Sequence, residues 1–289
     1  MPAQPFGLVE NPFAPGHDRR FVCPTRKRDE ALDLLRKAIA ERSPLVLVTG
    51  DPGIGKTSVV WDALSTPSLM ASVAVVTHGT LADTGLIEAA CHAFGIAPAP
   101  QGEMVALLEQ HLCDLRVRGR RAVLVIEDAH GIEPAQIEAI QTLSGMKAED
   151  RELLQIVLVG HPALEGRLAR SATRLLERVS RQVRILPLSA DETQRYLHHR
   201  VMVARGNGGA IFPSETCREI HSYTYGYPRD INILAGRSLE RAVRENGRHV
   251  TPDHVRAAVA VARLRGETTS PRPAADVPDF APAPPEPAA

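Results

Sequence analysis

Apolar residues in the first two thirds of the chain form short β-branched runs, separated by longer stretches with helical spacing. The runs predict five buried strands, at residues 46–49, 73–77, 122–126, 155–160 and 183–188. Helical spacing predicts helices over residues 26–42, 83–95 and 103–116. Strands that alternate with helices in this way are typical of an α/β fold, a parallel sheet with helices on both faces.

The pattern changes at Ser189, after which it predicts helices only. Ser189 and Glu192 have the spacing of a capping box, and further helices are predicted to begin near residues 213, 228 and 251. The last residues are rich in threonine, proline and alanine, a composition that predicts disorder. The expected organisation is an extended strap over 1–25, an α/β domain over 26–188, a small helical lid over 189–265 and a disordered tail over 266–289.

The first strand leads directly into a G-x-x-x-x-G-K-T sequence at residues 50–57, and a helix is predicted to follow. This is the phosphate loop of a nucleoside triphosphatase in the context that the motif requires. Lys56 is expected to reach the β- and γ-phosphates, and the Thr57 hydroxyl to bind Mg²⁺. The glycines allow backbone N–H groups to approach the phosphates. The residues predicted to bind the nucleotide here are Gly50, Asp51, Pro52, Gly53, Ile54, Gly55, Lys56, Thr57 and Ser58.

Two acidic residues, Glu127 and Asp128, end the predicted strand at 122–126. A carboxylate at the tip of a strand next to the phosphate loop holds Mg²⁺, and a second one activates the attacking water. The usual order is Asp then Glu, so here Glu127 is assigned to the metal and Asp128 to the water. The presumed base is then one methylene shorter than usual, and a misplacement of about 1 Å costs on the order of a hundredfold in rate. The sequence therefore predicts slow hydrolysis.

Four further residues are candidates for contacts with the phosphates. His161 follows the strand at 155–160 and is a candidate sensor of the γ-phosphate, the alternative being an ordinary loop histidine. Arg181, and next Arg178, lie where an arginine-rich helix is expected to give way to the fifth strand. Either is a candidate finger that reaches a neighbouring subunit's site, although such a run is also typical of a solvated helix face. Arg229 lies in the first turn of a predicted helix, where a cation is unfavourable unless it meets an anion.

Composition narrows the setting of the protein. The 289 residues contain 34 Lys and Arg and 34 Asp and Glu, so bulk charge favours neither nucleic acid nor a membrane surface as a partner. The four cysteines are far apart, which predicts free thiols in a reducing compartment. The chain shows no apolar signal core and no run as long as a membrane span. A cytoplasmic protein is expected.

Together these motifs resemble those of the AAA+ ATPases, with Gly226-x-Pro228-Arg229 similar to the family's sensor 2 motif. More narrowly, the chain resembles the ExeA (general secretion pathway protein A) type over about residues 8–262. The shared stretches include Asn11-Pro12-Phe13 and the segments at 28–32, 50–57, 126–130, 154–162, 186–189 and 226–232. The resemblance implies an AAA+ core with a helical lid, ATP and Mg²⁺ as ligands, and a homo-oligomer, either ring or filament. One departure is Glu127-Asp128-Ala129-His130, where the family has Asp-Glu-Ala-Gln.

The sequence is compatible with three functions. One is a slow ATPase switch whose protein partner belongs to a secretion, pilus or envelope assembly system. The second is a helper ATPase of DNA transposition, which assembles on duplex DNA with ATP and recruits a transposase. For this function the basic stretch at 116–121 is the best candidate DNA contact, with the basic residues at 19–20 and 26–28, although a solvated loop ahead of a buried strand is the favoured explanation of that stretch. The third is a nucleotide-binding scaffold with little turnover.

Overall fold

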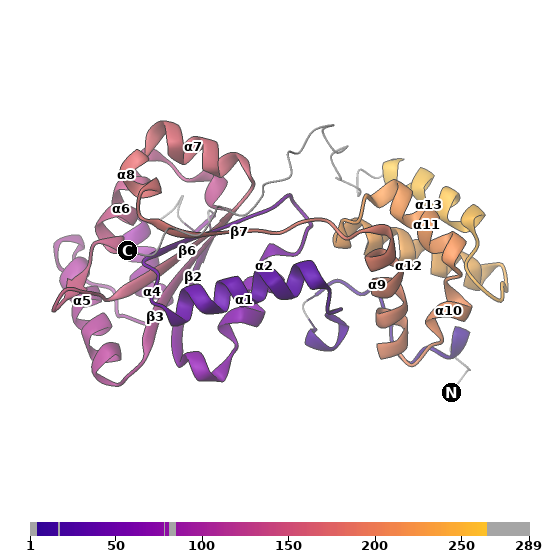
Figure 1. The fold of residues 1–289 in the computed structure, drawn as a ribbon, viewed down its shortest axis with the longest axis horizontal. Coiled ribbons are helices and arrows are strands. Elements are labelled where there is room, and N and C mark those ends of the chain that lie inside the picture. Colours follow the sequence, from indigo (N-terminus) through magenta and orange to yellow (C-terminus); the bar gives the residue numbers. More distant parts are fainter. Residues whose placement is uncertain (1–4, 17, 78, 81–84, 265–289) are drawn as a thin grey trace, which may run out of the picture.

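The computed structural model describes residues 5–16, 18–77, 79–80 and 85–264 (Figure 1). Five parallel strands form one sheet in the order β2-β3-β6-β1-β7. Their bounds are β1 Leu45–Thr49, β2 Ala71–Thr77, β3 Arg121–Glu127, β6 Leu154–Gly160 and β7 Val179–Arg184. The predicted α/β fold with a parallel sheet is confirmed.

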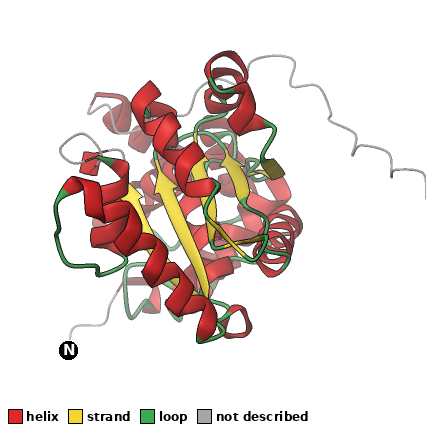
Figure 2. Cartoon of the chain, turned by 90° about the vertical axis from the view of Figure 1, so that its left-hand side faces the viewer, coloured by secondary structure: helices red, strands yellow, loops and turns green. Residues whose placement is uncertain are grey.

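Helices cover both faces of this sheet (Figure 2). Successive strand residues point to opposite faces, so Val46 and Val48 of β1 pack under α1 and α2, whereas Leu45 and Leu47 pack on the other face. The first face carries α1 Arg26–Ala40 and α2 Lys56–Leu64. The second carries α4 Leu86–Ala93, α5 Gln101–Val117, α6 Pro134–Ser144, α7 Ala163–Ser171 and α8 Thr173–Leu176. Short 3₁₀ turns lie at Pro5–Gly7, Arg19–Phe21, Pro67–Leu69 and Ala129–Gly131.

The residues after the sheet form helices around a hydrophobic core of their own, at the right in Figure 1. The Ser189–Glu192 capping box is present at the start of the first helix, with both reciprocal hydrogen bonds. The helices are α9 Ala190–Val203, α10 Gly208–Ile211, α11 Ser214–Thr224, α12 Pro228–Arg244 and α13 Pro252–Leu264. The four-residue α10 has no signal in the sequence pattern, because it is too short to show a helical period.

The strap at the N-terminus packs mainly on the lid, although it leads into α1 of the α/β domain. Phe13 meets Phe212 edge to face, with ring centroids 5.6 Å apart, and Phe21 and Cys23 are buried in the same lid core. The Val9 N–H donates to the Ala204 carbonyl at 3.0 Å. The N-terminal strap therefore completes the hydrophobic core of the lid.

Two expected elements are different in the structure. The fifth strand was predicted at 183–188 and lies at Val179–Arg184, because β7 is an edge strand with mostly exposed polar side chains. The apolar run that follows it instead connects the two cores, with Ile185 packed on the sheet and Leu188 on the lid. The single arginine-rich helix expected before β7 is two short helices, α7 and α8. A small hairpin, β4 Lys147–Ala148 and β5 Arg151–Glu152, was not predicted.

All four cysteines are free thiols, and three of them are buried, as predicted. The tail predicted at 266–289 lies outside the described residues. Among the helices of the described chain, none combines the length and the apolar character that a membrane crossing needs.

Candidate functional site

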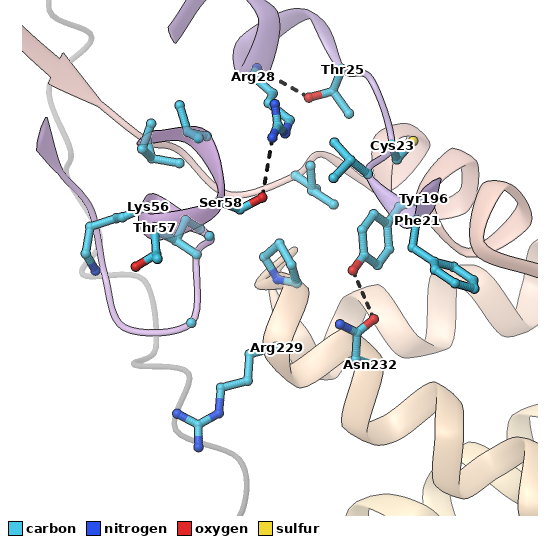
Figure 3. A pocket seen from close by; sticks show the side chains of 18 of the residues that line it. Phe21, Cys23, Thr25, Arg28, Lys56, Thr57, Ser58, Tyr196, Arg229 and Asn232 are labelled. Carbon is cyan, nitrogen blue, oxygen red and sulfur yellow. Dashed lines mark hydrogen bonds between the residues drawn. The ribbon is translucent and has the colours of Figure 1, made fainter. Parts of the chain in front are cut away.

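The main cavity of the described chain lies between the phosphate loop, the strap and the lid (Figure 3). Its volume is about 850 Å³, within the range of small-molecule and cofactor sites. One end is polar, with Lys56, Glu127, Asp128 and Arg229 in its lining. The other end is more apolar and is formed by the strap, the segment after β7 and the lid, including Phe21, Val22, Cys23, Ile185, Leu188 and Ile233.

The phosphate loop connects the carboxyl end of β1 to the start of α2. Gly53 and Gly55 have φ values of 77° and 98°, the left-handed region that glycine adopts without strain. Gly50 is required for another reason, because a Cβ there would lie 2.9 Å from Ile54 Cγ2 and 3.0 Å from the Ile185 carbonyl oxygen. The cavity lining includes Pro52, Gly53, Ile54, Gly55, Lys56, Thr57 and Ser58, but neither Gly50 nor Asp51.

Lys56 is the first residue of α2, and its Nζ donates to the carbonyl oxygens of Gly50 and Asp51 at 2.9 and 3.0 Å. Burial lowers the pKa of Lys56, and the nearby carboxylates of Asp128, Asp51 and Glu127 act in the opposite direction. Beside it, the Ser58 Oγ accepts a hydrogen bond from Arg28 at 3.4 Å, and Arg28 also pairs with the buried Asp62. These contacts hold α1 against α2 at the edge of the cavity.

Glu127 is the last residue of β3, and the position of this strand corrects one expectation. β3 is not next to β1, because β6 lies between them. The Glu127 Oε1 is buried and has no hydrogen-bond partner among the described residues. An orphaned buried carboxylate oxygen suits a divalent cation, since Mg²⁺ prefers oxygen ligands. The residues therefore fit the metal, which Glu127 and Thr57 would hold.

Asp128 follows in an exposed position, with a φ of 52° and ψ of 34°. A left-handed conformation is unusual for a residue other than glycine, and aspartate tolerates it better than most. Such strained residues gather at functional sites. The turn directs Asp128 into the cavity lining beside Lys56 and Glu127.

Arg229 lies in the first turn of α12, after Pro228 in the favoured first helical position. Its backbone N–H donates to the Gly53 carbonyl at 3.2 Å. A Cβ on Gly53 would lie only 2.9 Å from Arg229 Cβ. The lid helix thus begins directly on the phosphate loop, and Figure 3 shows the Arg229 side chain extending from the start of that helix.

His161 lies beside the phosphate loop, because β6 pairs with β1 and Gly160 is opposite Thr49. Its Nε2 is 3.3 Å from Asp51 Oδ1, and its Nδ1 accepts the Ala163 N–H at 3.2 Å. Tyr227, which the sequence interpretation missed, donates its hydroxyl to Asp51 Oδ2 at 2.6 Å. The only signal for Tyr227 was its place directly before Pro228-Arg229.

The two candidate finger arginines lie outside the main cavity. Arg178 is exposed ahead of β7, and its Nη1 donates to Ser144 Oγ at 3.2 Å. Arg181 lies within β7 rather than before it, and its Nη2 is 3.4 Å from Glu41 Oε2. Both are near the amino edge of the sheet. Arg181 lies opposite Val46, about 13 Å along β1 from Gly50 at the usual strand rise. Neither can reach the phosphates of its own chain.

The basic stretch at 116–121 is largely occupied by contacts within the chain. Arg116 donates to the Ala148 carbonyl and pairs with Glu149 at 2.7 Å. Arg121 donates to the Leu69 carbonyl at 2.7 Å. Arg116 thus ties the β4–β5 hairpin to α5, and Arg121 ties the turn before β2 to β3. Burial lowers the pKa of Arg42, and the positive charges of Arg121, Arg116 and Arg151 lower it further, so these four arginines lie close together near the amino edge of the sheet.

Residues 39–168 match the family model of the AAA domain. The matched region contains the phosphate loop and the Glu127–Asp128 pair. With the parallel sheet and the helices beyond it, the fold is that of a P-loop NTPase with an AAA+ core.

The chain is similar to general secretion pathway protein A of Aeromonas hydrophila, with 29% identity over 274 residues. The match includes 93% of this chain and 50% of the relative, so the chain spans about half the length of that protein.

Two solved structures share the fold. Cdc6p of Pyrobaculum aerophilum superposes with a TM-score of 0.69 and 21% identity, over 88% of this chain and 71% of that one. The ORC1 protein of Aeropyrum pernix in complex with DNA has a TM-score of 0.63 and 19% identity, over 88% and 69% of the two chains.

Proposed function

We propose that this chain binds ATP with Mg²⁺ and hydrolyses it slowly to ADP and phosphate, as an oligomeric molecular switch. The observation that carries the proposal is the convergence of the phosphate loop, Glu127, Asp128 and Arg229 on one cavity. Three elements that are far apart in sequence contribute a cation, two carboxylates and a second cation to its polar end. This is the set of charges that binding and cleaving a triphosphate requires.

Each residue has a distinct role in this proposal. The loop N–H groups and Lys56 hold the phosphates, and Arg229 approaches them from the lid. Glu127 and Thr57 hold Mg²⁺, which neutralises phosphate charge when it is bound. Asp128 orients and deprotonates the attacking water. The more apolar end of the cavity, between strap and lid, receives the nucleoside.

The decisive experiment measures ATP affinity and phosphate release for the purified chain and for Lys56→Ala. Loss of a charge-assisted contact of about 1.5–3 kcal/mol predicts ATP binding about 10- to 100-fold weaker in the variant. The control is Lys37→Ala, which removes an exposed lysine on α1 far from the cavity. Wild-type protein that binds no ATP would overturn the proposal. Binding without any phosphate release would instead identify a nucleotide-binding scaffold.

For the cellular role, we propose an ATPase that works in the cytoplasm with a protein partner in secretion, pilus or envelope assembly. The support is the similarity to general secretion pathway protein A along 93% of this chain. A strain that lacks the chain should lose assembly or secretion, and wild-type protein but not Lys56→Ala should restore it. Unchanged secretion and assembly in that strain would contradict this role.

A second candidate function is ATP-dependent binding to duplex DNA, as in a transposition helper that recruits a transposase. The observation that favours it is the positive charge at the amino edge of the sheet, where Arg42, Arg118 and Arg151 have exposed side chains. DNA affinity measured against salt concentration tests it, because each neutralised phosphate contributes about 0.9 to the slope of log K against log salt. Replacing these three arginines with alanine should lower the slope, and an absence of binding at low salt would exclude the function.

A further inference from the structure

Three separate parts of the chain meet at the Asp51 carboxylate. Asp51 belongs to the phosphate loop, Tyr227 is the N-cap residue of the lid helix α12, and His161 follows β6. The Tyr227 hydroxyl donates to Oδ2 at 2.6 Å, and His161 Nε2 is 3.3 Å from Oδ1. The carboxylate therefore links the lid to the end of the neighbouring strand through the loop that is proposed to hold the phosphates.

The hydrogen bonding assigns the direction of each contact. The Ala163 N–H donates to His161 Nδ1 at 3.2 Å, so Nε2 carries the proton, and it faces Asp51 Oδ1 at 3.3 Å. Burial raises the pKa of Tyr227, and the negative charges of Asp51 and Asp230 raise it further. Tyr227 is therefore a phenol at neutral pH and serves as a donor. The Asp51 carboxylate thus accepts the Tyr227 hydroxyl on Oδ2 and has the His161 ring N–H near Oδ1.

Tyr227 is held firmly by the α/β domain, although it lies in the lid by sequence. It is 5% exposed and packs in the core formed by α1, α2 and the sheet, together with Ile54 and Ile185. Directly before it, Gly226 has a φ of 82°, and its carbonyl accepts the Leu188 N–H at 3.0 Å. The start of α12 is thus fixed to the sheet by a buried ring and to the loop by a hydroxyl.

We propose that Asp51 and Tyr227 are positioning residues that set the place of Arg229 over the phosphates and couple the lid to the state of the phosphate loop. Neither side chain is among the described residues that line the main cavity, so their effect passes through Arg229, two residues after Tyr227. The hydroxyl–carboxylate bond fixes the first turn of α12, and the Arg229 N–H to Gly53 contact follows from that placement. This inference rests on the proposed ATP site.

The test is Tyr227→Phe, which keeps the buried ring and removes only the hydroxyl. We expect ATP to bind about 5- to 150-fold more weakly, the usual range for coupling between two sites. The control is Tyr225→Phe, which changes an exposed lid tyrosine two residues earlier. In an Arg229→Ala background, Tyr227→Phe should have no further effect on affinity, because the arginine through which it acts is gone. An additive loss in that background would show an independent structural role and overturn the proposal.

A second readout needs no nucleotide. The Arg229 amide is protected by its bond to Gly53, so its hydrogen exchange should accelerate in Tyr227→Phe and stay unchanged in Tyr225→Phe. Asp51→Ala should accelerate exchange of the Arg229 amide to the same extent. The double variant Asp51→Ala with Tyr227→Phe should accelerate it no further. If the wild-type chain binds ATP and Tyr227→Phe retains both its affinity and its protection, the positioning role is wrong. If the wild type binds no ATP, the proposed function itself fails.

Discussion

The order of Glu127 and Asp128 sets how far each carboxylate reaches from the end of β3. Glu127 has a buried oxygen that no described residue satisfies, whereas Asp128 is exposed in a left-handed turn. The longer side chain is thus on the residue assigned to the metal, and the shorter one on the residue assigned to the water. A carboxylate base whose side chain is one methylene too short to reach the attacking water lowers the rate of hydrolysis but not the affinity for ATP.

The double variant Glu127→Asp with Asp128→Glu should therefore hydrolyse ATP faster than the wild type. We expect kcat to rise about 10- to 100-fold, because a geometric error of about 1 Å is removed. Phosphate release at saturating ATP and Mg²⁺ measures this change. Asp128→Asn serves as the control and should lower kcat with little change in affinity. A double variant that is slower than the wild type would contradict the assigned roles.

The roles of single residues were predictable from sequence where the chemistry of the ligand alone determines the residue type. The phosphate loop and the acidic pair stand out because their residue types are constrained by phosphate and metal whatever the rest of the fold. The Tyr227–Asp51 contact joins positions 176 residues apart. Nothing local to either residue indicates it, since it depends on where the lid docks.

Gly226 is the point at which the lid is attached to the α/β domain. Its φ of 82° is accessible to glycine, and a Cβ there would collide with the backbone of Leu188. The backbone of Leu188, in the connection after β7, therefore crosses the backbone of Gly226 so closely that no side chain fits at position 226. Close backbone contact of this kind fixes an angle between two elements more strictly than side-chain packing does.

Gly226→Ala should displace the lid. We expect a lower melting temperature and weaker ATP binding, since both the collision and the positive φ oppose the native arrangement. Thermal unfolding and nucleotide titration measure the two effects. Gly236→Ala within α12 is the matched control, because its Cβ would make only an ordinary contact, 3.5 Å from Phe13 Cβ. Helix propensity then predicts a gain of up to about 1 kcal/mol. Equal behaviour of the two variants would contradict the role of Gly226.

Elements that are buried on both faces were predicted well, because a continuous apolar run leaves few other interpretations. The edge strand β7 was misplaced, since only two of its residues, Val179 and Val183, are apolar and the others are exposed polar residues. The hairpin β4–β5 turns through Glu149 and Asp150, both with positive φ. Neither residue carries the Asn-Gly or Asp-Gly signature of such a turn.

At the scale of the whole molecule, the phosphate loop and the two candidate finger arginines lie at opposite edges of one sheet. The phosphate loop lies at the carboxyl edge, and Arg178 and Arg181 lie near the amino edge. An arginine that cannot reach its own nucleotide is suited to a neighbour's, which supports the proposed ring or filament. The site would then be complete only between subunits.

Mixing inactive variants tests this arrangement. Lys56→Ala retains the arginines and loses the nucleotide, whereas the double variant Arg178→Ala with Arg181→Ala retains the nucleotide and loses the arginines. We expect each alone to be at least tenfold slower than the wild type and their mixture to regain part of the rate. Two preparations of the arginine variant, mixed together, should regain none. Normal hydrolysis by the arginine variant on its own would exclude a finger at either position.

The strap packs into the lid core, and this contact sets the order in which the chain becomes complete during synthesis. All five strands are available once residue 184 has left the ribosome, but the lid core into which Phe13 and Phe21 pack is complete only when the helices up to residue 264 have followed. At about 5–20 residues per second, those roughly 80 residues take about 4–16 s. During that interval the core around these two aromatic side chains is incomplete, which exposes the nascent chain to aggregation and chaperones. The cavity takes its last lining residue, Ile233, from the lid, so we expect nucleotide capture only after the lid helix α12 has been made.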